Sequence, residues 1–390
     1  MASPSLATTL CGNVRLDTCI FNASGPRTGS SDALAKIAAS AAGAVLAKSA
    51  TVLEQTGNDL PRTWQNDKVA SLNSEGLPNK GIGYYLSDEV IQAAGSKPYI
   101  VSLSGHNLAD NLAMLKQASA TKGVHAIELN LACPNVIGHP IIAYDFDQLS
   151  TVLTAVQATM ASSSTSLDTP LFHHRKKTRR VKLPPYFDGP QFEKAASIIN
   201  QFKCVQFVAS INTVGNALVV DAIAEMPAIR PKNGFGGLSG PAVKYSALAN
   251  VKKLRELLRP DIAVIGVGGV ESGEDSFNMI MCGAQAVQVG TCHWIEGPKC
   301  FDRIASELKD LMTQKGYNAV DEFRGKLQPW SKEGAAKSRD ARKAGGANKS
   351  NAVATVVESK ADSASLYAVI IVLLAVIAAL LVEKFNLTKP

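Results

Sequence analysis

The segment Asn130-Leu131-Ala132-Cys133-Pro134-Asn135 places a cysteine and two asparagines directly after an apolar run, residues 126–129. The run predicts a buried strand that ends at this segment. In parallel α/β proteins, the carboxyl ends of the strands are where the chemistry collects. A cysteine thiolate is a base or a nucleophile, and asparagine amides offer donors and acceptors to a small polar ligand. We therefore interpret the segment as an active-site loop, against the alternative of a buried structural cysteine.

Other polar residues also occur where strands are expected to end. Lys48-Ser49 and Asn212-Thr213 follow apolar runs, and Lys182 lies inside one. A lysine within an apolar strand must either reach solvent or find an anion. Two such lysines at one end of a sheet indicate an anionic ligand.

Glycine-rich segments end the last two predicted strands, at Gly266–Val270 and Gly290-Thr291, and a third such segment spans Gly234–Gly240. Backbone approaches a phosphate closely only where no Cβ intervenes. Together the segments suggest a phosphorylated cofactor. We expect the third segment to be mobile and the polar loop 62–85 to fold over the site.

Eight predicted strands alternate with stretches of helical periodicity, which favours parallel pairing and a (β/α)₈ TIM barrel with the site at its C-terminal mouth. An open doubly wound sheet is the alternative, but Asn22–Pro26 is not its glycine fingerprint. The predicted strands lie near Cys19–Ala23, Ala44–Ser49, Tyr99–Ser104, Ala126–Leu131, Val181–Leu183, Val205–Asn212, Ala263–Gly268 and Ala286–Gly290. The predicted helices are Ser31–Ala42, Ala109–Ser119, Phe192–Phe202, Ala247–Leu258 and Ser272–Cys282.

Composition supports a large core, because 46% of the 390 residues are hydrophobic and 19% are charged. Seven cysteines without a CxxC pair argue against a disulfide framework and against a zinc site, so we expect reduced thiols. Part of the net charge of +7 comes from the run His173–Arg180. Without interleaved aromatic residues, this run indicates a solvated loop rather than a nucleic-acid site.

The composition changes after Trp330, so we predict four regions: a catalytic barrel (1–330), a disordered linker (331–365), a transmembrane helix (366–382) and a short tail (383–390). The third region is apolar and free of charge, and as a helix it would be about 25 Å long, just enough to span a bilayer. We expect it to act as a tail anchor. Basic residues in the linker favour a barrel facing the cytoplasm, although the target membrane stays open.

These motifs together resemble the dihydroorotate dehydrogenase family, specifically its class 1A, fumarate-linked branch, over residues 5–326. The resemblance implies an FMN-dependent homodimer that oxidises dihydroorotate to orotate in pyrimidine biosynthesis and passes the electrons to fumarate, giving succinate. The motifs that carry it are Asn22–Gly25, Lys48-Ser49, Asn73–Asn79, Asn130–Asn135, Val181–Asp188, Ile211-Asn212, Pro231–Gly240, Gly268–Asp275, Gln288–Thr291 and Asp321–Gly325.

The resemblance also implies roles for individual residues. Cys133 is implied as the base that removes the proton from C5 of dihydroorotate before hydride passes from C6 to N5 of FMN. The implied substrate-binding residues are Lys48, Asn73, Gly76, Leu77, Asn130, Asn135, Asn212 and Thr213. The implied FMN-binding residues are Ala23, Ser24, Lys48, Ser49, Asn130, Lys182, Ile211, Gly240, Gly268, Gly269, Gly290 and Thr291.

The chain departs from the family pattern at several places. Glu75 replaces a methionine, and we expect its side chain to face away from the site, because the backbone of this loop does the binding. Thr213 replaces a serine and keeps the hydroxyl. The basic run ending at Arg180 resembles an insertion before the fifth strand, and the tail anchor is an addition to an otherwise soluble class.

Three alternatives stay open at this point. A dihydropyrimidine dehydrogenase-like barrel would have histidine where this chain has Asn135, and it would need cysteine clusters for iron–sulfur centres. A membrane-tethered barrel without catalysis would serve as a scaffold, a reading motivated by Glu75 and the insertion. A quinone-linked variant would pass electrons to the membrane, but quinone-linked relatives use serine in place of Cys133.

Overall fold

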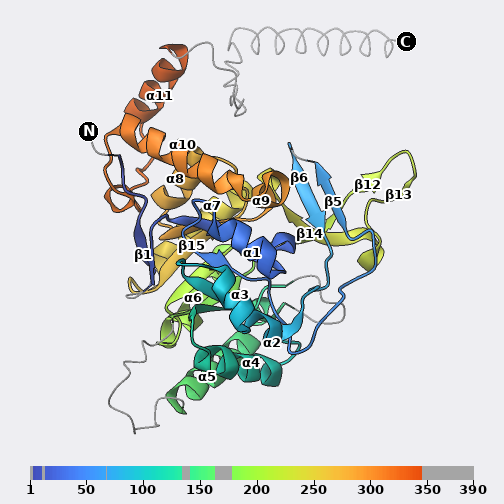
Figure 1. The fold of residues 1–390 in the computed structure, drawn as a ribbon. Coiled ribbons are helices and arrows are strands. Elements are labelled where there is room, and N and C mark those ends of the chain that lie inside the picture. Colours follow the sequence, from blue (N-terminus) through green and yellow to red (C-terminus); the bar gives the residue numbers. More distant parts are fainter. Residues whose placement is uncertain (1–2, 11–13, 67, 134–140, 163–177, 345–390) are drawn as a thin grey trace, which may run out of the picture. The chain divides into compact units, whose positions relative to one another are not determined.

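The computed structural model describes residues 3–10, 14–66, 68–133, 141–162 and 178–344 (Figure 1). The chain divides into two compact units, Met1–Leu327 and Gln328–Pro390, and each is described here by itself.

Eight strands of the first unit pair in parallel into one near-closed barrel, as the sequence predicted. The order around the sheet is β3-β16-β15-β10-β9-β8-β7-β4. Except for β9, which begins with Thr178–Arg180, the strands are mainly apolar and almost all their residues are buried, as a sheet covered on both faces requires. The barrel strands are β3 (Ile20–Asn22), β4 (Val45–Leu46), β7 (Tyr99–Leu103), β8 (Val124–Asn130), β9 (Thr178–Leu183), β10 (Phe207–Ser210), β15 (Ala263–Val267) and β16 (Ala286–Val289).

A side chain joins the two end strands, β3 and β4. The fully buried Asn22 amide donates to the Leu46 carbonyl (2.6 Å) and accepts from the Leu46 N–H (3.0 Å). The Gly43 N–H donates to the Ile20 carbonyl (2.8 Å) just below. A Cβ on Gly43 would lie 1.7 Å from the Thr18 carbonyl oxygen, so only glycine permits this approach.

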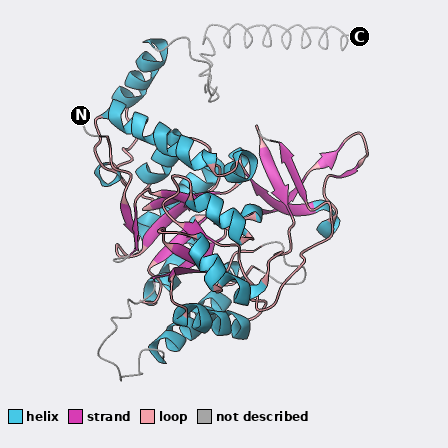
Figure 2. Cartoon of the chain, viewed as in Figure 1, coloured by secondary structure: helices cyan, strands magenta, loops and turns pink. Residues whose placement is uncertain are grey.

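Helices surround the barrel strands (Figure 2). Their starts follow capping rules, since Ser30, Asn107, Asp188 and Ser272 each accept a hydrogen bond from a backbone N–H in the first turn. The helices of this unit are α1 (Ser31–Ala38), α2 (Gly81–Tyr85), α3 (Asp88–Ala93), α4 (Leu108–Ala120), α5 (Phe146–Ser162), α6 (Gly189–Gln201), α7 (Lys244–Leu257), α8 (Gly273–Met281), α9 (Thr291–Glu296) and α10 (Lys299–Lys315), with 3₁₀ turns at Pro26–Thr28, Ile142–Tyr144, Pro231–Gly234, Pro241–Val243 and Val320–Glu322.

An antiparallel sheet stands to one side of the barrel (Figure 1), and it corrects the expectation of a mobile glycine segment at Gly234–Gly240. Most of that segment is the strand β14. A Cβ on Gly236 would lie 2.7 Å from the Asn73 carbonyl oxygen, so its glycines serve close strand pairing. The sheet contains β5 (Thr63–Asn66), β6 (Ala70–Asn73), β11 (Val214–Leu218) and β14 (Phe235–Ser239); two further hairpins pair β12 (Val220–Asp221) with β13 (Met226–Pro227) and β1 (Thr8–Leu10) with β2 (Val14–Leu16).

The basic run does not disturb the register of the fifth barrel strand. Residues 173–177 lie outside the described residues, and Thr178–Arg180 extend β9 toward its N-terminus, beyond the predicted start at Val181. Lys182 pairs with Asn130 of β8 and with Ala209 of β10. Lys182 therefore keeps its place at the barrel mouth.

In the second unit, part of the predicted linker is helical. Lys332–Ala344 form α11, because alanine, lysine and arginine are strong helix formers even where no core is available. The linker was predicted to be disordered over 331–365, and these residues are helical in the structure. Residues 345–365, the apolar segment 366–382 and the tail 383–390 lie outside the described residues. Among the helices that the structure does describe, none is both long and apolar enough to cross a membrane.

Candidate active site

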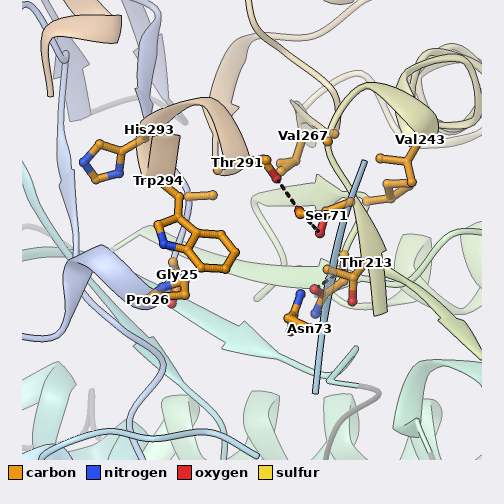
Figure 3. Close-up of a pocket in the computed structure, with 18 of the residues that line it drawn as sticks. Gly25, Pro26, Ser71, Asn73, Thr213, Val243, Val267, Thr291, His293 and Trp294 are labelled. Atoms are coloured by element: carbon orange, nitrogen blue, oxygen red, sulfur yellow. Dashed lines mark hydrogen bonds between the residues drawn. The ribbon is translucent and has the colours of Figure 1, made fainter. Parts of the chain in front are cut away.

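A cavity opens at the C-terminal ends of the barrel strands (Figure 3). Residues at the ends of β3, β4, β8, β9, β10, β15 and β16 line it, together with β6 and β14 of the antiparallel sheet. Both the barrel and the added sheet therefore build the site.

The cavity collects nearly all the residues that the sequence singled out. Gly76 is an exception, because it does not line the cavity. A Cβ at this position would lie 2.3 Å from Asn58, so the turn requires glycine here. Asn135 lies outside the described residues. The predicted residues that line the cavity are Ala23, Ser24, Lys48, Ser49, Asn73, Leu77, Asn130, Cys133, Lys182, Ile211, Asn212, Thr213, Gly240, Gly268, Gly269, Gly290 and Thr291.

Two asparagines fix the backbone next to Cys133. The Asn130 side-chain oxygen accepts from the Ala132 N–H (3.2 Å), and the Asn212 amide donates to the Ala132 carbonyl (2.8 Å). Asn212 also donates to the Asn130 oxygen (3.3 Å), which ties β8 to the end of β10. Cys133 is a half-buried cysteine on the cavity wall and forms no disulfide. The asparagines thus position the thiol in addition to offering polar atoms to a ligand.

A chain of hydroxyls runs from this wall into the barrel. Asn130 donates to Ser49 (3.3 Å), and Ser49 shares a hydrogen bond with Ser102 (2.9 Å). Ser102 donates to the carboxylate of Glu128, which is fully buried (3.0 Å). Ser24 joins the same chain through Ser49 (3.1 Å). These contacts hold the strand ends of β3, β4, β7 and β8 at fixed spacing.

Two buried lysines supply positive charge to the cavity. Lys48 is 8% exposed and Lys182 is 5% exposed. Burial lowers the pKa of Lys48, and the nearby negative charges of Glu75 and Cys133 oppose that effect, whereas Arg62 adds to it. An anionic ligand would compensate the burial of both lysines.

The glycine turns after β15 and β16 form the opposite end of the cavity. Gly268 and Gly269 have φ of +128° and +67°, and a Cβ on Gly269 would lie 2.7 Å from the Lys244 side chain. Lys244 forms an ion pair with Asp275 (2.7 Å), which also accepts from the Glu271 N–H. The backbone here approaches the cavity without side chains, as a phosphate cradle requires.

The polar wall between these ends suits a phosphorylated cofactor. Ser71 of β6 and Thr291 share a hydrogen bond across the cavity (3.2 Å), drawn as the dashed line in Figure 3. The Thr213 hydroxyl is buried and has no hydrogen-bond partner among the described residues. A buried hydroxyl on a cavity wall can donate a hydrogen bond to a ligand. The donor set and the glycine turns therefore fit a phosphorylated cofactor.

Several cavity residues were missed or wrongly placed. Glu75, whose side chain was expected to face away, lines the cavity, while its carboxylate pairs with Arg62, which does not line it. Ser71 was missed because it lies on β6 of the antiparallel sheet. The polar sequence 62–85 predicted a loop there rather than strands. His293 and Trp294 follow Thr291 on the short α9, and burial lowers the pKa of His293 to about 4. No local pattern pointed to this pair.

Among the described residues, no group of histidine, cysteine and carboxylate side chains could hold a metal ion. The described cysteines are all free thiols.

Comparison with known proteins gives one consistent family. The model of the family "Dihydroorotate dehydrogenase" matches residues 5–312. A "Dihydroorotate dehydrogenase (fumarate)" of Saccharomyces mikatae is 43% identical over 327 residues, 83% of this chain and 98% of the relative. A "Dihydroorotate dehydrogenase A (fumarate)" of Lactococcus lactis is 41% identical over 82% of this chain and 98% of the relative. The crystal structure of ligand-free DHODH from Eimeria tenella has a TM-score of 0.68 at 21% identity and covers 84% of this chain and 93% of that one, a likeness in fold.

Proposed function

This chain belongs to the dihydroorotate dehydrogenase family, and on that premise we propose that it oxidises dihydroorotate to orotate with fumarate as the electron acceptor. It is an oxidoreductase acting on a CH–CH bond. Relatives more than 40% identical over nearly their whole length carry the fumarate-linked name.

The observation that carries the proposal is one cavity that combines Cys133 with two buried lysines and the glycine turns of β15 and β16. A thiol held at a strand end serves as a base toward an acidic C–H. Buried cations attract the carboxylate of dihydroorotate and the two carboxylates of fumarate. A scaffold without catalysis would have no need of this set of residues.

FMN, when bound, would supply the hydride acceptor for dihydroorotate and the electron donor for fumarate. Cys133 would take the proton from C5, and Asn130 and Asn212 hold its backbone in place for that step. Lys48 would bind the substrate carboxylate, and its positive charge in the cavity would favour a reduced, anionic cofactor.

The remaining polar residues hold the cofactor and the substrate. Lys182 would help to hold the cofactor, and the Thr213 hydroxyl, unpartnered in the described chain, would donate to the substrate. The backbone of the two glycine turns would hold the cofactor's phosphate. We propose as cofactor-binding residues these residues of the cavity wall: Ala23, Ser24, Lys48, Ser49, Asn130, Lys182, Ile211, Gly240, Gly268, Gly269, Gly290 and Thr291.

Anaerobic turnover tests the proposal. The purified chain, given dihydroorotate and fumarate without oxygen, is expected to form orotate and succinate in equal amounts. Orotate formation that requires a quinone and ignores fumarate would contradict the acceptor. A chain that binds no flavin and forms no orotate would support the scaffold alternative instead.

We also propose that the apolar segment 366–382 anchors the enzyme to a membrane with the barrel in the cytoplasm. The segment is uncharged and about 25 Å long as a helix. Deleting residues 331–390 is expected to abolish flotation with lipid vesicles and to leave turnover unchanged. A truncated chain that still floats would remove the anchor, and one that loses turnover would make the tail part of the enzyme.

The active enzyme is, in our proposal, a homodimer. The β12–β13 hairpin exposes apolar side chains, with Ile223 97%, Val220 61% and Met226 56% exposed, more than an isolated monomer surface favours. Sedimentation of the chain lacking residues 331–390 is expected to give a dimer, and Ile223→Asp is expected to give a monomer. A monomeric parent would contradict the proposal, and a variant that remains dimeric would exclude this hairpin from the interface.

A further inference from the structure

The loop between β6 and α2 carries an acidic residue on the wall of an otherwise cationic cavity. Glu75 is 9% exposed and lines the cavity together with Lys48, Asn73 and Cys133. Its carboxylate pairs with the Arg62 guanidinium (Nε to Oε2, 3.0 Å), and both side chains are largely buried. A carboxylate is unfavourable beside anionic ligands, so its presence there calls for a role.

The ion pair has a fixed orientation. Arg62 also donates to the carbonyls of Thr56 (2.8 Å) and Asn58 (3.1 Å), while the Asn58 N–H donates to the Glu75 carbonyl (2.9 Å). Glu75 lines the cavity and Arg62 does not, and the negative charge of Glu75 acts on the buried Lys48 of the same cavity. Arg62 restrains the Glu75 carboxylate, and Asn58 restrains its backbone, so the negative charge stays close to the cavity.

We propose that Glu75 is a specificity-determining residue: its carboxylate, held by Arg62, weakens the binding of dianions in this cavity more than the binding of monoanions. The inference rests on the proposed function, because it takes orotate and fumarate as ligands of one site. Orotate carries one negative charge at neutral pH and fumarate carries two. The acceptor is thereby kept from occupying the site ahead of dihydroorotate.

The size of the effect follows from Coulomb's law, in which the interaction energy is proportional to the ligand's charge. Loss of the carboxylate in Glu75→Gln also leaves Arg62 without its partner, so the cavity becomes more positive. We expect the dissociation constant of orotate to fall about threefold and that of fumarate about tenfold. In logarithms the change for the dianion is twice the change for the monoanion.

The test is a titration of the oxidised, flavin-loaded chain with orotate and with fumarate, followed by the flavin absorption spectrum. Neither ligand reacts with oxidised flavin, so the dissociation constants need no turnover. Failure of this inference is thereby distinct from failure of the proposed function, which would appear as a parent enzyme without fumarate-dependent turnover. High salt is expected to reduce the difference between the shifts in the two dissociation constants, because dissolved ions screen the part of the electric field of Glu75 that reaches solvent.

Matched variants separate charge from shape. Glu75→Met removes the same charge as Glu75→Gln and is expected to give the same two shifts. Asp59→Asn removes a carboxylate from the same stretch of chain, at an exposed site (72% exposed) paired with Arg230, and is expected to change neither constant. Equal shifts for orotate and fumarate, no shift, or different shifts for the Gln and Met variants would each overturn the proposal.

A second readout is the pH dependence of orotate binding, which reports the protonation of Lys48. The ionisable neighbours of Lys48 are Glu75, Cys133 and Arg62. The negative charge of Glu75 raises the pKa of Lys48 against the lowering by burial. Without Glu75, Lys48 loses its proton at a lower pH. The alkaline loss of orotate binding is therefore expected at lower pH in Glu75→Gln than in the parent, and an unmoved profile would contradict the placement of Glu75 beside Lys48.

Discussion

Replacing Cys133 with alanine is expected to leave the flavin bound and to slow its reduction by dihydroorotate about 10²- to 10⁴-fold, the range that a general base contributes. The thiol is the group that Asn130 and Asn212 hold at the cavity wall, so its loss removes the proton acceptor while the frame stays intact. Anaerobic stopped-flow absorbance of the flavin measures the rate. The affinity of the oxidised variant for orotate, read from the flavin spectrum, reports whether the frame has survived without requiring proton transfer.

Cys204→Ala is the matched control, because Cys204 is another half-buried free cysteine and does not line the cavity. It is expected to be reduced at the parent rate. An unchanged rate in the Cys133 variant would remove Cys133 from the mechanism. Loss of flavin from that variant would instead assign Cys133 to the cofactor site.

Replacing Lys48 with methionine is expected to weaken orotate binding about 100-fold, within the cost of removing one partner of a buried charge pair. Methionine fills a similar volume without charge, so the barrel wall is retained. Glu75 and the bound anion then share the cavity without this cation. Titration of the oxidised flavin spectrum with orotate measures the constant, and Lys116→Met, an exposed lysine on α4, is the control.

The pH dependence of the parent has a predictable sign. Burial lowers the pKa of Lys48, so its positive charge, and with it orotate binding, is present at low pH and is lost as pH rises through that lowered pKa. The Lys48→Met variant is expected to lack this alkaline loss. A variant that binds orotate as the parent does would show that Lys182 alone supplies the charge.

The barrel could be predicted because most of its strands are apolar runs separated by capped helices. Each of the eight predicted strands exists, with ends that shift by a few residues because a buried run does not mark where pairing stops. The antiparallel sheet was missed for the opposite reason. Its strands are short, polar or glycine-rich, and only pairing with distant segments, such as β14 with β6, makes them strands.

Those site residues that follow directly after a barrel strand could be predicted from the sequence. Cys133, Lys48, Lys182 and the glycine turns gather at one mouth because parallel strands bring their carboxyl ends together. The orientation of Glu75 was not predictable, since it depends on Arg62, far enough along the chain that no local spacing links the two. In α11, by contrast, the helix propensity of neighbouring residues is enough to form a helix, although no hydrophobic core supports it.

The central claim is that one cavity carries out both half-reactions, and an anaerobic flavin spectrum of the purified chain tests it most directly. Addition of dihydroorotate is expected to bleach the oxidised flavin, and subsequent addition of fumarate is expected to restore it. Bleaching that only a quinone reverses, or a flavin that dihydroorotate does not bleach, would contradict the account.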